Sequence, residues 1–351
     1  MRGAAANLGL ALGSTLLALL AIEAYLRWVG AFEMPAGAGC YEFTDNPRLI
    51  YEPKPHCGGT NAAGMHDREF DLARTRDPIV VIGDSVSVGP GVPSAWAWPE
   101  RLERLINRRR GGRDVLNFAV EGYATVQEVE TLRTKALRFR PRTVLLQYLM
   151  NDEEIYSSIF VTMMEELRRR KTEAYVEAHQ ALDPRSGWLA RRVLLSRTAI
   201  ALRLGLAHVA RSFGDGAATP DAVKAYYTEH SPVREGLEEL GRLASAYRFD
   251  VLVLIFPHAW GTGADRGGAV LPELSEYPHA WVFDNARMLG LCRELGFTCI
   301  DLAGVVYENP RLRALSSRRM FNDGCCHLGV LGHKVMAWVV YRELVARHLM
   351  R

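Results

Sequence analysis

The sequence predicts an α/β domain built on a parallel sheet with helices on both faces. Short apolar runs rich in β-branched residues alternate with segments of helical spacing from residue 79 to the C-terminus, and such alternation is typical of a parallel sheet. The 351 residues, 48% hydrophobic and 24% charged, suffice for one large domain with a sizeable core. Glycines and small polar residues directly follow several apolar runs. In open parallel sheets, that edge is where ligands bind.

The N-terminus departs from this pattern. Ala4 to Ile22 is a run of 19 residues without a charge, preceded by Arg2 and followed by Glu23 and Arg27. A helix of that length can cross the roughly 30 Å core of a bilayer. We expect residues 1–30 to form an uncleaved membrane anchor. A cleaved signal peptide is the alternative, although no convincing small-x-small cleavage site follows the run, and a buried globular helix is a third possibility.

Residues 31–77 are rich in Pro, Gly and Asn and show no sustained period, so we expect an irregular lead-in. The main domain is expected to span residues 78–351. Its strands are predicted at residues 79–82, 115–118, 144–148, 251–256 and 298–302. Its helices are predicted at residues 98–109, 126–139, 236–247, 283–295 and 332–349.

A helical insertion is expected from Glu153 to about Arg234. Within it, Pro184 to Gly214 carries six arginines and no acid, interleaved with apolar residues. Such a segment can lie on an anionic membrane surface. It can equally be a cap that packs on the domain and leaves its arginines in water.

Cysteine content and charge limit the class of protein. The six cysteines of an exported chain invite disulfides, and the spacings allow Cys40 with Cys57 and Cys292 with Cys299, or free buried thiols. The net charge is only +3, without zinc-finger spacing or a basic stripe interleaved with aromatics, so we expect no nucleic-acid partner. Gly83 to Gly91 lacks the Lys of a phosphate-binding loop, so nucleotide binding is not expected either.

Three successive predicted strands deliver polar groups to one edge of the sheet. Ser85 follows the first strand, Gly122 lies after the second, and Asn151 follows the third. Acyl transfer needs such a set, because a nucleophilic hydroxyl must act beside donors aimed at the developing oxyanion. The glycine can offer its backbone N–H and the asparagine its side-chain N–H.

A serine hydroxyl also needs a base. Near the C-terminus, we select His327 as the base and Asp323 as the carboxylate that orients it. The neighbouring Cys325, Cys326 and His333 lack a second Cys pair at zinc spacing, so we expect no metal.

These residues resemble the four blocks of the SGNH hydrolases, also called the GDSL esterase/lipase family: Ser85 in Gly-Asp-Ser, Gly122, Asn151 in Asn-Asp, and His327. The lead-in from Asn61 to Phe70 resembles a membrane-anchored bacterial branch. The resemblance covers roughly residues 61–152 and 235–345. It implies a three-layer α/β/α, flavodoxin-like fold, no cofactor, and an oxyanion hole formed by the N–H groups of Ser85 and Gly122 and by the Asn151 side chain.

Two positions depart from the family pattern. Leu149 replaces the glycine that usually precedes x-Asn-Asp. The family's Asp-x-x-His block would place the acid at position 324, which is Gly324, whereas Asp323 lies one residue further from His327. Asp323 therefore completes a triad only if the loop brings it to the imidazole, and otherwise the site is a Ser-His dyad.

The sequence thus predicts a membrane-tethered, extracytoplasmic serine esterase that acts through an acyl-enzyme, or a secreted one if the N-terminal segment is cleaved. An O-acyltransferase acting on an envelope glycan would use the same residues. A non-catalytic, glycan-binding or scaffolding descendant of the fold is the alternative from another class. The substrate is expected to be an acyl ester, on an acylated polysaccharide, a lipid or a small molecule.

Overall fold

The structure is a computed structural model, and it divides into two compact units. One unit comprises Met1–Glu52 and Phe160–Ala217, and the other comprises Pro53–Ile159 and Ala218–Arg351. The residues that the structure describes are 2–28, 39–44, 46, 48–109, 112–153, 193, 196–199, 201–202, 231–257, 285–309, 312, 320–322 and 326–349. Each unit is described by itself below.

The first unit contains the apolar helix α1 (Arg2–Trp28) and a two-stranded sheet of β1 (Tyr41–Phe43) and β2 (Tyr51–Pro53). Within α1, the stretch Gly9–Trp28 is long and apolar enough to cross a membrane, and none of it is buried. The segment predicted to be an irregular lead-in thus includes two short strands. Strands of three residues are too short to show a period, and here the Tyr41 and Tyr51 rings meet edge to face at 5.7 Å.

The second unit is built on a five-stranded parallel sheet. Its strands are β3 (Ile79–Ile82), β4 (Val115–Asn117), β5 (Thr143–Tyr148), β6 (Asp250–Ile255) and β7 (Thr298–Asp301). Their order in the sheet is β4-β3-β5-β6-β7. Taken in chain order this is 2-1-3-4-5, the flavodoxin-like order. The predicted fold class is confirmed.

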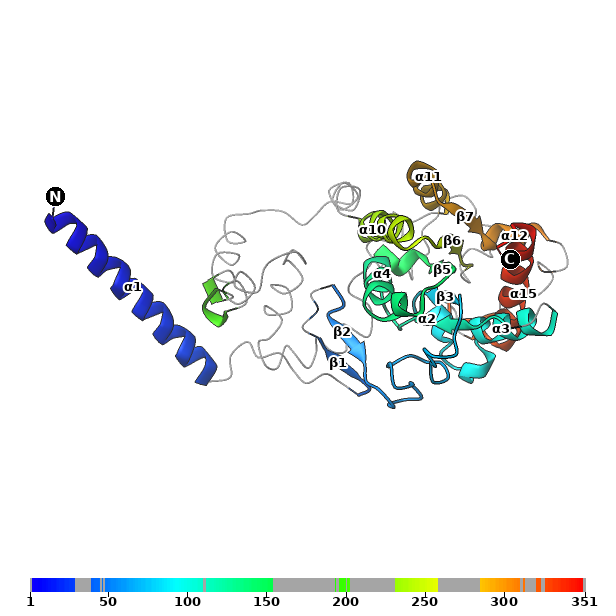
Figure 1. The fold of residues 1–351 in the computed structure, drawn as a ribbon, viewed down its shortest axis with the longest axis horizontal. Coiled ribbons are helices and arrows are strands. Elements are labelled where there is room, and N and C mark those ends of the chain that lie inside the picture. The colour runs from blue at the N-terminus through cyan, green and yellow to red at the C-terminus, as the bar shows by residue number, and fades with distance from the viewer. Residues whose placement is uncertain are drawn as a thin grey trace, which may run out of the picture. The chain divides into compact units, whose positions relative to one another are not determined.

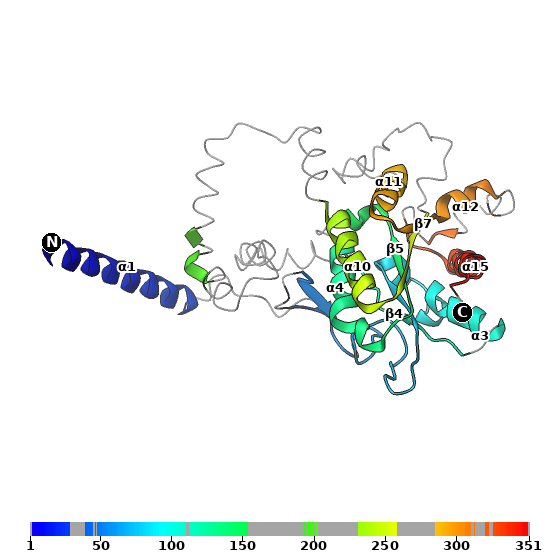
Figure 2. The ribbon, with the colours of Figure 1, turned by 45° about the horizontal axis from the view of Figure 1, so that its top comes forward.

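Helices cover both faces of this sheet (Figure 2). One face carries α4 (Thr125–Thr131), α10 (Pro232–Tyr247) and α11 (Asn285–Leu295). The other carries α3 (Trp98–Arg109), α12 (Leu302–Glu308) and α15 (Val330–Ala346). β3, β4 and β5 are buried along their whole length, because both faces are covered.

The strands and helices predicted within residues 78–152 and 235–351 exist, with ends shifted by a few residues. The helical insertion expected from Glu153 to about Arg234 lies mostly outside the described residues. One predicted element differs in kind: the helix expected over residues 126–139 is α-helical only to Thr131. It continues as a π-helical turn, Leu132–Ala136, and a 3₁₀ turn, Leu137–Phe139. The change of helix type falls within the last two turns, which is too short a stretch for apolar periodicity to reveal.

One of the two disulfides that the spacings allowed is present. Cys292, in α11, is bonded to Cys299, in β7. Cys40, Cys57 and Cys326 are also disulfide-bonded. Most of the Arg-rich stretch from residue 184 to 214 lies outside the described residues.

Candidate active site

Ser85 begins α2 (Ser85–Val88), a single helical turn that starts directly after β3. Asp84 caps this turn, because its Oδ1 accepts the N–H of Val86 at 2.9 Å. Gly89 ends the turn in the left-handed conformation with φ 81°, which glycine adopts without strain. The sequence therefore forms a sharp elbow with Ser85 at the carboxyl edge of the sheet.

Gly83 allows the elbow to lie against β5. A Cβ there would come within 2.6 Å of Gln147 Oε1. That oxygen accepts the N–H of Asp84 at 3.2 Å and the hydroxyl of Ser87 at 2.9 Å. Gln147 is fully buried, so it ties both sides of the nucleophile turn to the sheet from beneath.

His327 approaches from the opposite end of the sequence. Its Nε2 lies 3.0 Å from Ser85 Oγ. The segment that carries it closes through a bridge between Phe321 and Leu328. Asn322 holds it further, because its N–H donates to His327 O at 2.8 Å and its side chain donates to Leu328 O at 3.3 Å. A serine hydroxyl and an imidazole at this distance can exchange a proton.

The expected oxyanion donors surround the same edge. The strand order changes direction between β3 and β5, so the turns after these strands open a crevice where ligands bind in such sheets. Asn151, after β5, donates from Nδ2 to Asp84 Oδ2 at 3.0 Å. The segment leading to Gly122 is tied to the elbow, because Val120 N–H donates to Gly83 O at 3.0 Å.

Two backbone donors are available at this edge. Gly122 has φ 72°, and neither its N–H nor that of Ser85 donates to another residue in the described part of the chain. With the second hydrogen of Asn151 Nδ2, these groups can serve an oxyanion.

Buried carboxyls lie beneath the site. Burial raises the pKa of Asp84, although the hydrogen bonds from Asn151 and Val86 act to lower it. Burial also raises the pKa of Glu128 well above its usual range, and the charges of Asp152 and Asp84 act in the same direction. Among the described residues, neither Glu128 oxygen has a hydrogen-bond partner. Burial therefore favours the neutral form of Glu128.

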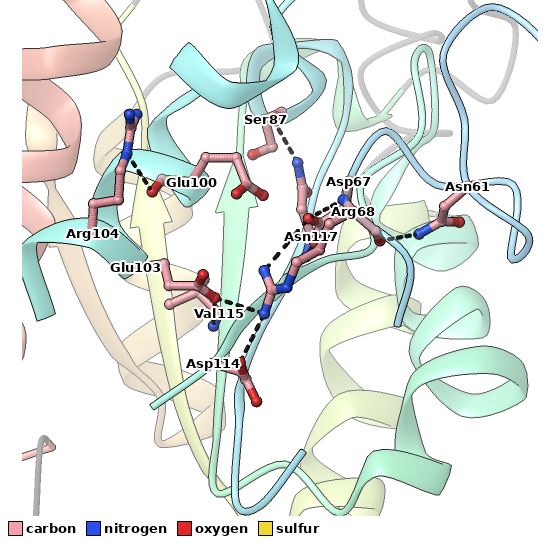
Figure 3. Close-up of polar contacts among 10 residues, drawn as sticks. All are labelled: Asn61, Asp67, Arg68, Ser87, Glu100, Glu103, Arg104, Asp114, Val115 and Asn117. Carbon is pink, nitrogen blue, oxygen red and sulfur yellow. Dashed lines mark hydrogen bonds and ion pairs between the residues drawn. The ribbon is translucent and has the colours of Figure 1, made fainter. Parts of the chain in front are cut away.

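A second polar network connects the lead-in to the nucleophile turn (Figure 3). Asp67 Oδ2 accepts the N–H of Asn117 at 2.9 Å, and the Asn117 side chain donates to Ser87 O at 3.0 Å. Arg68 Nη2 bridges Glu103 and Asp114 at 2.9 and 2.8 Å. The lead-in thus supports the elbow through Asn117.

Asp67 shares a proton with Glu100. Burial and the adjacent charge of Asp67 raise the pKa of Glu100 to about 9. Glu100 is therefore protonated at neutral pH and donates to the Asp67 carboxylate, which also accepts the Arg68 N–H at 2.6 Å.

Asp323, the expected triad acid, lies outside the described residues. Asp301 caps α12 by accepting the N–H of Gly304 at 3.0 Å. Among the described residues, no group of three His, Cys, Asp or Glu side chains could hold a metal ion.

Comparison with known proteins adds fold relatives. No protein-family model and no curated protein matches the chain. Solved structures do match, and among them are lipolytic proteins and esterases. TesA is 14% identical with a TM-score of 0.40, over 76% of this chain and 97% of that chain.

Two further matches name an activity. A lipolytic protein of the G-D-S-L family from Desulfitobacterium hafniense is 9% identical with a TM-score of 0.41, over 76% of this chain and 99% of that chain. The acetylxylan esterase Axe2 from Geobacillus stearothermophilus is 13% identical with a TM-score of 0.42, over 77% of this chain and 94% of that chain. The fold is established by the strand order itself, and activity is argued from the chain's own residues.

The sequence did not single out Gln147, Asn322 or Asp67. For Gln147 a signal existed, because it is a polar residue inside the apolar run of β5. Such a residue in a strand buried on both faces needs a specific partner.

Proposed function

We propose that this protein is a serine esterase that hydrolyses an ester-linked acyl group through an acyl-enzyme. One observation carries the proposal: Ser85 Oγ and His327 Nε2 lie 3.0 Å apart although 242 positions separate them in the sequence. A core histidine has no need to meet a serine at the carboxyl edge of the sheet, next to unoccupied backbone donors.

In the first step, Ser85 Oγ attacks the ester carbonyl carbon while His327 Nε2 takes the hydroxyl proton. Negative charge develops on the carbonyl oxygen, toward the N–H groups of Ser85 and Gly122 and the Asn151 amide. The tetrahedral intermediate collapses, His327 gives the proton to the leaving alcohol, and the acyl group remains on Ser85.

In the second step, water attacks the acyl-enzyme. His327 accepts a proton from that water and then returns it to Ser85 Oγ as the acid leaves. A sugar hydroxyl in place of water would make the same site an O-acyltransferase.

Asp323 is proposed as the carboxylate that accepts the Nδ1 proton of His327. Loss of a triad acid lowers kcat about 10⁴-fold in the serine proteases. A smaller loss would indicate a Ser-His dyad.

We propose that α1 anchors the protein in a membrane with the second unit outside the cytoplasm. Two observations support this. Near the C-terminal end of α1, Glu23 accepts hydrogen bonds from the Thr198 N–H and hydroxyl at 2.8 and 2.9 Å. Such contacts are expected of a segment that stays attached to the protein and is not removed as a signal peptide. The Cys292–Cys299 disulfide suits an oxidising compartment.

The test follows hydrolysis of short-chain p-nitrophenyl esters by the full chain in a nonionic detergent. We expect Ser85→Ala and His327→Gln to abolish activity. Ser94→Ala is the matched control, because Ser94 is exposed and contributes only its backbone carbonyl to Ala97. Asp323→Asn then distinguishes a triad from a dyad.

Covalent labelling by a fluorophosphonate separates a wrong substrate from a wrong mechanism. Labelling at Ser85 that requires His327 would support an active nucleophile even if the chosen esters are not turned over. If neither turnover nor labelling rises above the Ser85→Ala background, the esterase proposal is contradicted and a binding or scaffolding role is favoured.

A further inference from the structure

Helices α3 and α15 run side by side on one face of the sheet (Figures 1 and 2). A cavity of about 410 Å³ is lined by residues of these two helices and by Leu312. Its apolar lining comes from Leu105, Leu312, Leu331, Val335, Ala337 and Trp338. The volume is that of a small-molecule site. We call it the α3–α15 groove. It contains none of the residues assigned to the esterase site, so nothing in the proposed reaction accounts for it.

Four cations line the same groove: Arg101, Arg104, Arg108 and Lys334. Within the described part of the chain, none of them forms an ion pair. The acids nearest in sequence are engaged elsewhere, Glu100 with Asp67 and Glu103 with Arg68. Burial and the charge of Arg104 lower the pKa of Arg101. Arg101 donates to the carbonyl of Trp96, and Arg104 donates to those of Glu100 and Ala95. Among the described residues, the positive charge along the apolar floor is therefore not compensated by an acid.

Exposed tryptophans accompany these cations. Trp338 is 41% exposed and Trp96 is 45% exposed. Arg342 lies over the Trp338 ring at 4.9 Å, and Arg101 lies over the Trp96 ring at 5.5 Å. Tryptophan together with basic and aliphatic side chains is typical of protein surfaces at the membrane interface.

We propose that the α3–α15 groove binds an anionic phospholipid. The lipid phosphate lies against the cations of the groove, and a lipid acyl chain lies on the apolar floor of the groove. Charge complementarity selects an anion, and the floor selects an amphiphile over a fully polar polyanion. The chain also carries a candidate membrane span in α1. A tether of this kind keeps a lipid site at high effective concentration of its ligand.

The test uses the full chain in maltoside micelles and measures tryptophan emission on addition of dioctanoyl-phosphatidylglycerol or dioctanoyl-phosphatidylcholine. The two lipids share acyl chains and differ in headgroup charge. We expect an emission change that is absent in Trp338→Phe. Phosphatidylglycerol should produce the change at about tenfold lower concentration than phosphatidylcholine. Its binding should weaken as the salt concentration is raised.

Variants assign the effect to the groove. Neutralising two cations with Arg104→Gln and Lys334→Gln should weaken phosphatidylglycerol binding by roughly 25-fold, at about fivefold for each. The matched control removes two exposed arginines elsewhere, Arg76→Gln and Arg138→Gln, and should leave binding unchanged. A thermal melt shows that each variant is folded.

Three results would overturn the proposal: equal binding of the two lipids, unchanged binding in the neutralised variant, or stronger binding of decanoate or soluble polyglutamate than of phosphatidylglycerol. Decanoate would identify a fatty-acid site, and polyglutamate would identify an acidic polymer. Failure of the esterase test would leave these measurements intact, because they do not depend on turnover.

Discussion

The side chain of Asn151 is tied to Asp84, the residue before the nucleophile, by a hydrogen bond of 3.0 Å from Nδ2 to Oδ2. Asp84 also caps the turn that begins at Ser85. One buried carboxylate therefore fixes both the helical turn of the nucleophile and the direction of the amide expected to stabilise the oxyanion. Asp84 therefore couples the position of Ser85 to the orientation of the Asn151 amide.

The first prediction follows from this coupling. Asp84→Asn presents an amide to the Asn151 amide, so that either the Val86 cap or the Asn151 contact must be lost. We expect kcat to fall by roughly 10²-fold with KM little changed, because one oxyanion donor is worth 10²–10³. Ester hydrolysis by Asp84→Asn, Asn151→Ala and the double variant measures this. The double variant should be no worse than Asn151→Ala, and fully additive losses would show that Asp84 does not act through Asn151.

Gly83 gives the second prediction. The Cβ of Gly83→Ala would lie 2.6 Å from Gln147 Oε1 and 3.0 Å from Ser87 Oγ. Overpacking of this kind costs about 1–3 kcal/mol of the free energy of unfolding, and displacement of Gln147 would also shift the Ser85 turn. We expect both stability and kcat to fall, as measured by denaturant unfolding and ester hydrolysis.

Gly290→Ala in α11 is the control for that substitution. Its Cβ would find no atom closer than 3.9 Å, so alanine should stabilise the helix by about 0.5–1 kcal/mol. If both variants behaved alike, the close approach at Gly83 would not explain the presence of glycine there.

The sheet was predictable because its signals are local. Apolar runs such as Val80 to Ile82 are bounded by Gly, Asn or Asp, and in parallel sheets these polar residues meet at one edge. Ser85 was placed at that edge by its strand, whereas His327 follows no predicted strand and was selected as the base from its place near the C-terminus and from the resemblance. The order β4-β3-β5-β6-β7 came from the resemblance and not from periodicity.

Contacts between distant residues were not predictable in this way. Trp98 N–H donates to His333 Nδ1 across 235 positions, and no local pattern records it. Likewise, the arginines of α3 are indistinguishable in sequence from a solvated helix face. Only the packing of α15 brings Lys334 and Trp338 beside them.

The third prediction concerns the proton shared by Asp67 and Glu100. The pKa of Glu100 is raised from 4.5 to about 9 in the folded protein. Between these values the folded state holds a proton that the unfolded state has lost, so the free energy of unfolding falls as pH rises. Glu100→Gln keeps a donor for Asp67 and removes the titration. Urea unfolding from pH 5 to 9 should therefore show the wild type losing stability relative to Glu100→Gln, and parallel curves would contradict the shared proton.

In the fourth prediction, the free energy of unfolding changes with pH in the opposite direction. His333 is fully buried, accepts the N–H of Trp98 at 3.1 Å, and has a pKa lowered to about 4 by burial and by the charge of Arg101. Between pH 6.5 and 4 the unfolded chain takes up a proton that the folded protein refuses, so stability falls as pH is lowered. At about 1.4 kcal/mol per pH unit, the His333 titration should lower the free energy of unfolding of the wild type by roughly 2 kcal/mol between pH 6.5 and 5.

His333→Gln removes that titration while offering a side-chain carbonyl to Trp98. The variant should be less stable than the wild type at pH 7, because the imidazole packs against Gly89 at the end of the nucleophile turn. The difference should shrink as the pH is lowered, and chemical denaturation at pH 5, 6 and 7 measures it. A difference that stays constant over this range would mean that His333 is protonated in the folded protein as readily as in the unfolded chain. The link from α15 to Trp98 would then have to be carried by packing alone.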